Sequence, residues 1–427
     1  MRVSTNQIYD AGAQGIQQSH SALFKLNNQL ATGRRVLTPQ DDPVAAAQAL
    51  VVTQSKEVNQ QYINNQGQAK HQLALVDSQL NSITSLLNNV RDKVIQAGNT
   101  ILTQPDRNAI ASEVEARLAE LVGIANSDNG VGEFLFSGFS GNVKPFAATA
   151  TAAIPPATTS PMQYFGDNGE RLVQVSSSRQ MSVNVSGNEL FMSPKQGNGT
   201  FVAQAATTNT GIGVVDTGSV LNPQQWATAI NNTTAVGTPL EIRFSNDASG
   251  NLQYQIHDPV GNLGATIPFV SGQAIPLISA SGDNFGAQII ITGQPAVGDS
   301  FTVKASTSQS MFQTLQNLLG VLRNPVNATT YTNTQYANQL NAELSNIDQA
   351  LGNVSRIQSD IGIKRQEIDS LKNTLSDLDI QYQSNLSELQ DLDYNKAISD
   401  FIKQQINLEA AQKSFAQISG LSLFKYL

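Results

Sequence analysis

The sequence of 427 residues contains no cysteine. A disulfide framework and a zinc site built on thiolates are therefore both excluded. The three histidines, His20, His71 and His257, lie far apart in the sequence. This spacing argues against a histidine-based metal site or catalytic cluster.

Charged residues make up 14% of the chain and aromatic residues 6%, and short polar side chains and alanine take their place. Such a composition suits a protein whose faces are covered by copies of itself or by neighbours, although a merely Asn/Gln-rich soluble protein would share it. The formal net charge is −8, and basic residues occur singly or in small groups such as Arg34-Arg35. Nucleic-acid binding through a long basic stripe is therefore not expected.

Long apolar runs are also missing, because none approaches the roughly 18 residues that a transmembrane helix needs. The first residues, MRVSTNQIYDAGAQG, lack the apolar stretch and small-residue cleavage site of a secretory signal peptide. Read alone, this pattern predicts a cytoplasmic protein. An uncleaved export signal without its own structure would leave the same pattern.

Motifs that carry chemistry are absent: the sequence has no P-loop, HExxH, nucleophile elbow or complete GxGxxG. Asp41-Asp42 could form a carboxylate pair for acid–base work, but their position directly before Pro43 favours capping of a helix. Trp226 with Tyr254 could form a glycan platform, but a single Trp in a small domain usually belongs to its core. We therefore predict no catalytic, cofactor-binding or metal-binding residues, and no enzyme activity.

The N-terminal part carries helical periodicity instead. Residues 1–43 contain an amphipathic seam that stops at Gly33, and the segment 33–43, GRRVLTPQDDP, is predicted to be a loop. A helix is predicted over 44–98, and Pro105-Asp106 opens another. The 44–98 helix has apolar residues at an alternating spacing of three and four, typical of a coiled coil: Leu73, Val76, Leu80, Ile83, Leu87, Val90, Val94 and Ala97.

The C-terminal third repeats this pattern over a greater length. Every seventh position is apolar: Leu340, Ile347, Val354, Ile361, Ile368, Leu375, Tyr382 and Leu389. Residues 333–417 contain no proline, so one continuous helix on the order of 125 Å long is predicted. Such a rod must lie against another rod. The N-terminal helices are the expected partners, with a separate coiled-coil dimer as the alternative.

The middle of the chain differs from both ends. A Pro/Thr/Ala linker at 147–161 precedes short runs with strand character. These runs are 171–177, 182–186, 241–245, 252–258, 265–270, 287–293 and 301–306. One short helix is predicted over 222–232, with Asn222 as its cap. The predicted fold is α+β: a long antiparallel helical rod from the N- and C-terminal thirds, with an inserted, mainly β outer domain.

Four terminal segments carry a family resemblance: MRVSTNQIY (1–9), QLATGRRVLTPQDDPVAAAQAL (29–50), GEFLFSGF (132–139) and AAQKSFAQISGLSLFKYL (410–427). They resemble the family of flagellar hook–filament junction proteins, the third hook-associated proteins, which is itself related to flagellin. The middle of the chain shows no such match. The resemblance implies a structural adaptor of the bacterial flagellum.

The resemblance also implies an organisation and a set of partners. Residues 1–43 and 395–427 would form an inner helical domain, 44–146 and 306–394 a helical rod domain, and 147–305 a variable outer domain. The protein would leave the cell unfolded through the type III export channel, with a chaperone covering its C-terminal helix. It would then form a ring of identical subunits between the preceding hook-associated protein and flagellin, without inserting into a membrane.

Two alternatives remain open at this point: flagellin itself, with the same fold, and a glycan-binding or enzymatic outer domain. For the junction function we predict that assembly depends on apolar residues near both ends. They are Ile16, Leu23, Leu26, Leu30, Phe401, Ile402, Phe415, Ile418, Leu421, Leu423, Phe424 and Leu427. Burying each such side chain is worth about 1.5–3 kcal/mol, so a few suffice to drive association.

Overall fold

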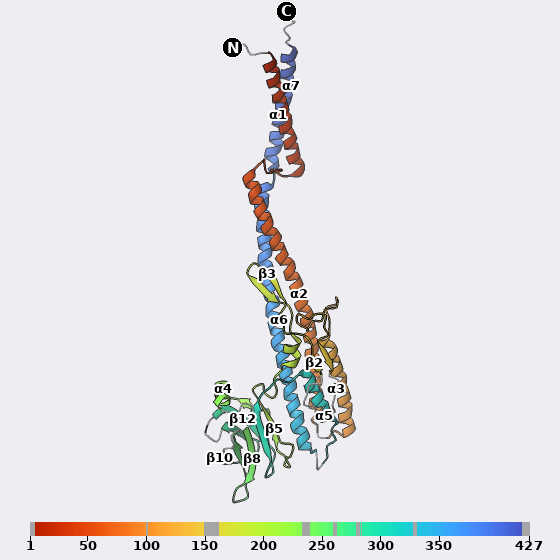
Figure 1. The fold of residues 1–427 in the computed structure, drawn as a ribbon, viewed down its shortest axis with the longest axis vertical. Helices are drawn as coiled ribbons and strands as arrows, with labels where there is room; N and C mark the ends of the chain where they lie inside the picture. Colours follow the sequence, from red (N-terminus) through yellow and green to blue (C-terminus); the bar gives the residue numbers. More distant parts are fainter. Residues whose placement is uncertain are drawn as a thin grey trace, which may run out of the picture. The chain divides into compact units, whose positions relative to one another are not determined.

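The computed structural model describes residues 5–99, 101–148, 162–232, 240–258, 263–278, 282, 284–327 and 331–420. The helices are α1 (Thr5–Thr32), α2 (Pro43–Ala97), α3 (Gln104–Ala125), the π-helix η1 (Asn188–Met192), α4 (Pro223–Asn232), α5 (Met311–Arg323), α6 (Asn333–Gln390) and α7 (Tyr394–Gly420) (Figure 1). The terminal thirds are helical and the middle carries the strands, which confirms the predicted fold class.

The residues form two compact units. The terminal unit comprises residues 1–67, 174–179 and 368–427, and the central unit comprises residues 68–173 and 180–367. Helices α2 and α6 contribute residues to both units. The finer division into five segments that the sequence suggests stays a prediction.

Helix α6 lies antiparallel to α2, as two ion pairs of the central unit show. Arg91 pairs with Asp348 at 2.7 Å, and Arg365 pairs with Asp77 at 2.6 Å. The earlier residue of α2 thus pairs with the later residue of α6, so the two helices run in opposite directions. The predicted partner of the long C-terminal helix is thus a helix of the same chain, and a separate dimer is not needed to cover its seam.

The predicted seam of α2 is shielded from solvent along its whole length in the central unit. Its eight apolar residues are at most 2% exposed: Leu73, Val76, Leu80, Ile83, Leu87, Val90, Val94 and Ala97. On α6, Leu340, Ile347, Val354, Ile361 and Ile368 are buried in the same way, Leu375 is 7% exposed, and Tyr382 and Leu389 are half-buried. The regular heptad therefore loses cover toward its C-terminal end.

The prediction of one continuous helix over 333–417 is wrong, because α6 ends at Gln390 and α7 begins at Tyr394. Asp393 caps the new helix, since its Oδ1 accepts hydrogen bonds from the amides of Asn395 (3.0 Å) and Lys396 (3.2 Å). The amide of Leu392 donates to a carbonyl outside the helix, that of Gly33, at 2.9 Å. The break depends on a contact across the whole chain, which helical periodicity does not report.

The central unit contains a bundle formed by α2, α3, α5 and α6. The start of α3 shows the capping box at Thr103 and Asp106, in agreement with the predicted opening at Pro105-Asp106. Helix α5, which the sequence reading missed, has most of its residues buried, including Met311, Phe312, Leu315 and Leu318. Four buried aromatic rings pack together beside it: Phe136, Phe146, Phe191 and Phe312, with centroids 5.2–5.6 Å apart.

The strands are β1 (Phe146–Ala148), β2 (Met162–Tyr164), β3 (Leu172–Ser176), β4 (Arg179–Ser182), β5 (Phe201–Ala205), β6 (Val214–Val215), β7 (Ser219–Val220), β8 (Leu240–Asn246), β9 (Leu252–His257), β10 (Leu263–Pro268), β11 (Ala274–Ile278), β12 (Asn284–Thr292) and β13 (Ser300–Ala305). An antiparallel five-stranded sheet runs β10-β9-β8-β13-β5, and a smaller sheet runs β11-β12-β6, with β7 also on β12. Both contribute to one apolar core.

Six of the seven predicted strand runs overlap strands of the structure, and one is wrong. The run 182–186 falls outside β4 except for its first residue, because the chain there is held by a side chain rather than by a strand ladder. Asn184 Oδ1 accepts from the amide of Arg171 at 2.7 Å, and Asn184 Nδ2 donates to the carbonyl of Gly169 at 2.9 Å. Residues 149–161 of the predicted linker lie outside the described residues.

Helix α4 follows the predicted pattern, since Asn222 Oδ1 accepts from the amides of Gln224 and Gln225, both at 3.1 Å. Its Trp226 is 8% exposed and packs against Phe201 and Phe285, with ring centroids 5.1 and 5.8 Å away. Tyr254 is buried in the same core. Neither ring is available as a glycan platform, which supports the prediction that Trp226 belongs to the core.

Candidate assembly surface

Helices α1 and α7 lie side by side and antiparallel in the terminal unit (Figure 1). At one end the rings of Tyr9 and Phe415 meet edge to face, 5.9 Å apart, and Gly12 leaves the room that Phe415 occupies. At the other end Gly33 faces the hydroxyl of Tyr394. The two ends of α1 are thus matched to opposite ends of α7.

Between these ends, α1 turns a continuous seam toward α7. Its members follow the alternating spacing of three and four, which continues to Gly33 just after the helix: Tyr9, Gly12, Ile16, Ser19, Leu23, Leu26 and Leu30. The predicted assembly residues Ile16, Leu23, Leu26 and Leu30 all belong to it and are half-buried. A helix pair without a third layer leaves the outer half of such a seam open to solvent.

The predicted residues of α7 fall into two groups. Phe401 and Phe415 share the partly covered face with Ala397 and Leu408, which are 4% and 8% exposed. Ile402 points away from this face and is 51% exposed. The side chains of Ile418, Leu421, Leu423, Phe424 and Leu427 lie outside the described residues, so their role stays a prediction.

A second apolar face of α7 contains the predicted Ile402 together with two isoleucines that were not predicted. Ile398, Ile402 and Ile406 recur every fourth residue and are 47%, 51% and 61% exposed. We call these three residues the isoleucine stripe. Their spacing places them on one side of the helix, which is the signal that would have revealed them.

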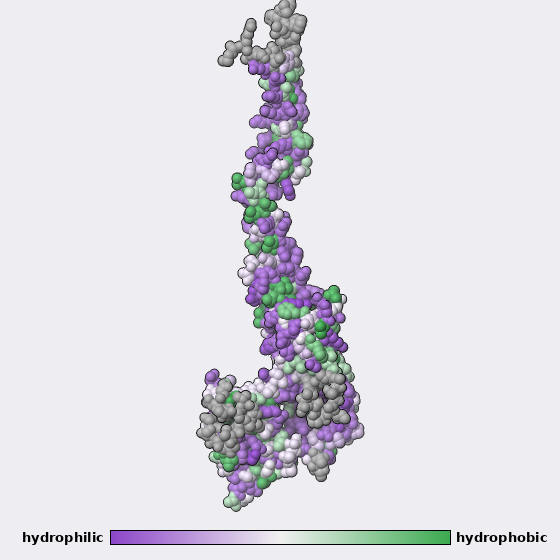
Figure 2. All heavy atoms as spheres, viewed as in Figure 1, coloured by the Kyte–Doolittle hydropathy of each residue, from purple (hydrophilic) through white to green (hydrophobic). Residues whose placement is uncertain are grey.

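Helix α2 also begins with an uncovered apolar face, which we call the free seam: Val44, Ala47, Val51 and Val58. Val44, Val51 and Val58 are 67%, 63% and 41% exposed, and neighbouring Leu50 is 70% exposed. Figure 2 shows hydrophobic side chains gathered on the surface where α2 begins. The spacing of three and seven from Val44 is that of a coiled-coil seam, yet no described helix covers it.

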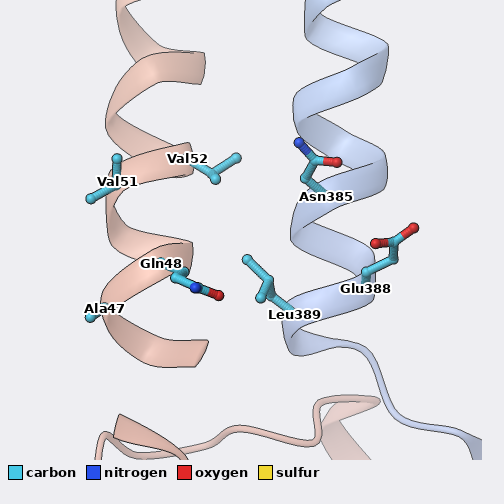
Figure 3. Close-up of a pocket in the computed structure, with 7 residues that line it drawn as sticks. All are labelled: Ala47, Gln48, Val51, Val52, Asn385, Glu388 and Leu389. Carbon is cyan, nitrogen blue, oxygen red and sulfur yellow. The ribbon is translucent and has the colours of Figure 1, made fainter. Parts of the chain in front are cut away.

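The free seam borders a groove of about 520 Å³ between α2 and the end of α6. Its walls are Ala47, Gln48, Val51 and Val52 from α2, and Asn385, Glu388 and Leu389 from α6. Figure 3 shows Val52 and Leu389 pointing toward each other across it. The lining is mainly apolar, with Glu388 as its one charged side chain.

The loop of residues 33–42 and the segment 389–393, which ends α6 and leads into α7, hold each other by hydrogen bonds, and we call this arrangement the clasp. The Arg35 amide donates to the Gln390 carbonyl (2.7 Å), and its guanidinium donates to the Leu389 carbonyl (2.9 Å). In return the Leu392 amide donates to the Gly33 carbonyl (2.9 Å). Gly33 has φ of +70°, a conformation that glycine adopts at little cost.

The acidic pair before α2 caps this helix and braces the clasp. Asp42 Oδ1 accepts from the Ala45 amide at 3.0 Å, which is the N-cap geometry that the sequence favoured over acid–base chemistry. Asp41 pairs with Lys25 at 2.6 Å and accepts from the Thr38 amide at 2.9 Å. Hydrogen bonds from Lys25 and from the Thr38 and Leu37 amides lower the pKa of Asp41 to about 2. The pKa of Asp42 is also lowered, first by the hydrogen bond from the Ala45 amide and then by that from Arg35.

Residues 59–66 of α2, NQQYINNQ, form a polar stretch before the regular heptad, and they have a role in the terminal unit. Asn59 Nδ2 donates to the carbonyl of Leu375 at 2.8 Å, and Gln66 Nε2 donates to that of Val175 at 2.7 Å. Both amides are buried. They bind backbone carbonyls where apolar residues could not, which explains why the stretch is polar.

A buried polar cluster in the central unit attaches the sheet region to α6. Around a cavity of about 260 Å³, Asn338 Oδ1 accepts from the Val215 amide (2.9 Å), and Ser345 Oγ donates to the Gly197 carbonyl (2.5 Å). Glu343 is buried in this cluster, and desolvation raises its pKa to about 7. Its Oε2 accepts from Asn346 Nδ2 (3.1 Å). With amides as its hydrogen-bond partners, Glu343 is suited to holding the two parts together rather than to catalysis.

Within the described ranges, no group of three or more His, Asp or Glu side chains is arranged to hold a metal ion. Over the same ranges, no helix combines the length and apolar content that a membrane span requires.

Both ends of the chain match models of one family. The bacterial flagellin N-terminal helical region matches residues 3–140, and the bacterial flagellin C-terminal helical region matches residues 344–427. Together the two matches cover just over half of the chain.

Individual relatives and solved structures agree with this. Flagellar hook-associated protein 3 of Salmonella typhimurium is 23% identical over 425 residues, covering 100% of this chain and 99% of that protein. The crystal structure of the flagellar junction protein FlgL from Legionella pneumophila has a TM-score of 0.67 at 26% identity, covering 81% of this chain and 100% of that one. FlgL from Xanthomonas campestris gives 0.65 at 25% identity, covering 79% and 99%.

Proposed function

The chain belongs to the bacterial flagellin family, among its hook-associated proteins, and from this premise we propose that it joins the flagellar hook to the filament as a structural subunit. Its place is in the flagellum, in association with other flagellar components. The relatives that match over its full length are hook-associated proteins, whereas the curated flagellin-like relative matches 31% of the chain. The junction function is therefore better supported than the filament function of flagellin itself.

One observation carries the mechanism: the terminal unit leaves apolar seams uncovered that are suited to a further layer of helices. The α1–α7 seam is half-buried, while the isoleucine stripe and the free seam are largely exposed. Contiguous exposed apolar surface marks an interaction site. Neighbouring subunits would supply the missing layer. The terminal unit would then make the contacts between subunits, while the central unit folds around its own core.

The identity of the partners follows from a junction function. Identical copies would form a ring, with the preceding hook-associated protein on one side and flagellin on the other. The chain would be secreted through the flagellar export channel, and an export chaperone would cover the apolar C-terminal helix before assembly. The exposed isoleucine stripe supports this last point, because such a face associates non-specifically unless it is covered.

We also propose that the chain has no catalytic activity. Glu343 is the described carboxyl whose pKa lies near neutrality, and its partners are amides. Asp41 and Asp42 serve as cap and brace. A substrate that the pure protein turns over, with activity lost on replacing a single carboxylate, would overturn this proposal.

The function is tested by deleting the gene in the source bacterium and analysing cells and culture medium. A junction subunit is required for filament growth but not for flagellin synthesis. We expect hooks without filaments and monomeric flagellin in the medium, with motility restored by the wild-type gene. Loss of the filament protein itself from both cells and medium would identify the chain as flagellin, and normal filaments would exclude both functions.

A further inference from the structure

Two uncovered apolar surfaces of the terminal unit are complementary in chemistry. The isoleucine stripe is a convex row of three β-branched side chains on α7. The free seam and its groove offer valine, alanine and leucine side chains on α2 and α6. Knobs of one helix packing into a hole formed by others is the ordinary geometry of coiled coils.

Resting on the junction function, we propose that the isoleucine stripe of one copy packs into the groove beside the free seam of a neighbouring copy. Ile402 and Ile406 would enter between Val51 and Leu389 of the next subunit. This contact covers on each copy the surfaces that the monomer leaves exposed.

A second copy fits as the occupant because the two surfaces belong to different elements of one chain. A contact between unlike surfaces is heterologous, so each subunit offers one free half to the next, and the contact repeats into a closed ring or an open helical array. A contact of the stripe with another stripe would instead stop at a dimer. A ring-forming subunit requires the repeating arrangement.

Charge supports the same pairing. Glu388 lines the groove, and Lys403 lies three residues before Ile406 on α7, at the edge of the stripe. Neither side chain forms an ion pair with any described residue of its own chain. Bringing the stripe to the groove would place this lysine near this glutamate, with opposite signs at the rim of an apolar contact.

The contact is tested by photo-crosslinking in assembled flagella. Ile406 is replaced by benzoylphenylalanine in a strain lacking the natural gene, and the crosslinked peptides are identified by mass spectrometry. We expect a product of twice the chain mass that joins position 406 to residues 44–58 or 385–389 of a second copy. Ile363 on α6, also 61% exposed, is the matched control and should not reach these residues.

Other products would overturn the inference. A crosslink of position 406 to α7 of a second copy would show a stripe-to-stripe contact, and a crosslink to another flagellar protein would show a different occupant. Absence of any product in motile cells would show that the stripe stays free. These outcomes differ from failure of the junction function, in which the strain without the gene would keep its filaments.

A charge exchange at the rim provides a second measurement, read out on the same crosslink from position 406. Glu388→Lys or Lys403→Glu alone should place like charges together and lower the yield of the 406 crosslink about fivefold, as expected for a rim ion pair. The double exchange restores opposite signs and should restore the yield. If the double variant crosslinks no better than the single variants, Glu388 and Lys403 do not meet and the proposed pairing is wrong.

Discussion

The two units are built from the same heptad pattern but bury it to different degrees. In the central unit, Leu80, Ile83 and Leu87 of α2 are completely buried, because α3 and α5 complete a bundle with α2 and α6, as the ion pairs between these helices show. In the terminal unit, Leu23 and Leu26 of α1 are half-buried against a single partner helix. The difference teaches that periodicity specifies an apolar face, whereas the number of surrounding helices decides whether the chain itself covers it.

The largest expected effect separates folding from assembly. Deleting residues 416–427 removes the end of α7 and the apolar residues that follow it. Because the central unit has its own core, we expect the main thermal transition measured by calorimetry to stay nearly unchanged. We expect incorporation to be lost, with flagellin released into the medium instead of polymerised.

The intact gene expressed from the same plasmid is the control for that experiment. If the shortened chain supports normal filaments, these terminal residues are not needed for assembly. If its main thermal transition collapses, the two units are not independent in the way that their burial indicates.

A pair of matched substitutions measures the same contrast energetically. Leu87→Ala opens a cavity in the central core and should lower the free energy of unfolding by about 2–5 kcal/mol. Leu26→Ala truncates a half-exposed side chain of the α1–α7 seam and should lower the free energy of unfolding of the main transition by less than about 1 kcal/mol. Urea denaturation of both variants provides the measurement. Equal losses would contradict the division between a self-sufficient core and a seam reserved for neighbours.

Glu343 gives the central unit a dependence on pH. Its pKa is raised from 4.5 to about 7 in the folded chain, so the folded state holds its proton more tightly than the unfolded state. The associated stability is present below pH 4.5, is lost as pH rises toward about 7, and stays lost above. The loss should be on the order of 3 kcal/mol. Glu343→Gln should abolish this slope in urea titrations, and an unchanged slope would show that another group causes it.

The smallest effect concerns the clasp of the terminal unit. At Gly33, φ is +70° and an added Cβ would lie 2.9 Å from the Tyr394 hydroxyl. Gly33→Ala should cost about 1–2 kcal/mol locally and speed hydrogen exchange of the Leu392 amide. Gly15→Ala is the matched control, because a Cβ there meets nothing within 4 Å and alanine favours helix. Equal exchange in both variants would show that the clasp does not depend on glycine.

Sequence predicted the helices, their caps and the central seam because these depend on local periodicity and on side chains a few residues away. Asn222 and Asp42 cap their helices as expected. The break before Tyr394 was missed because the Leu392 amide bonds to Gly33, a residue from the other end of the chain. Helix α5 was missed although its leucines, such as Leu315 and Leu322, have helical spacing.

The candidate surface was predicted less completely than the fold. The density of apolar residues near the C-terminal end indicates Ile402, whereas Ile398 and Ile406 stand out only from their angular position on the helix. The same pattern indicates Leu23 and Leu26, which α7 partly covers. Val44 and Val51 were passed over, since a pattern of apolar residues does not state whether the covering helix comes from the same chain.

The clasp links residues that are 354 positions apart, Arg35 and Leu389. Closing so long a loop has a large entropic cost, and contacts of such high contact order form late in folding. The hairpin of β8 and β9 in the central unit closes a much shorter loop and can form earlier. Whichever end of an unfolded chain emerges first, the clasp can form only after the opposite end has also arrived. The sheet region can therefore fold before the clasp closes, and the late closure of the terminal unit delays premature association.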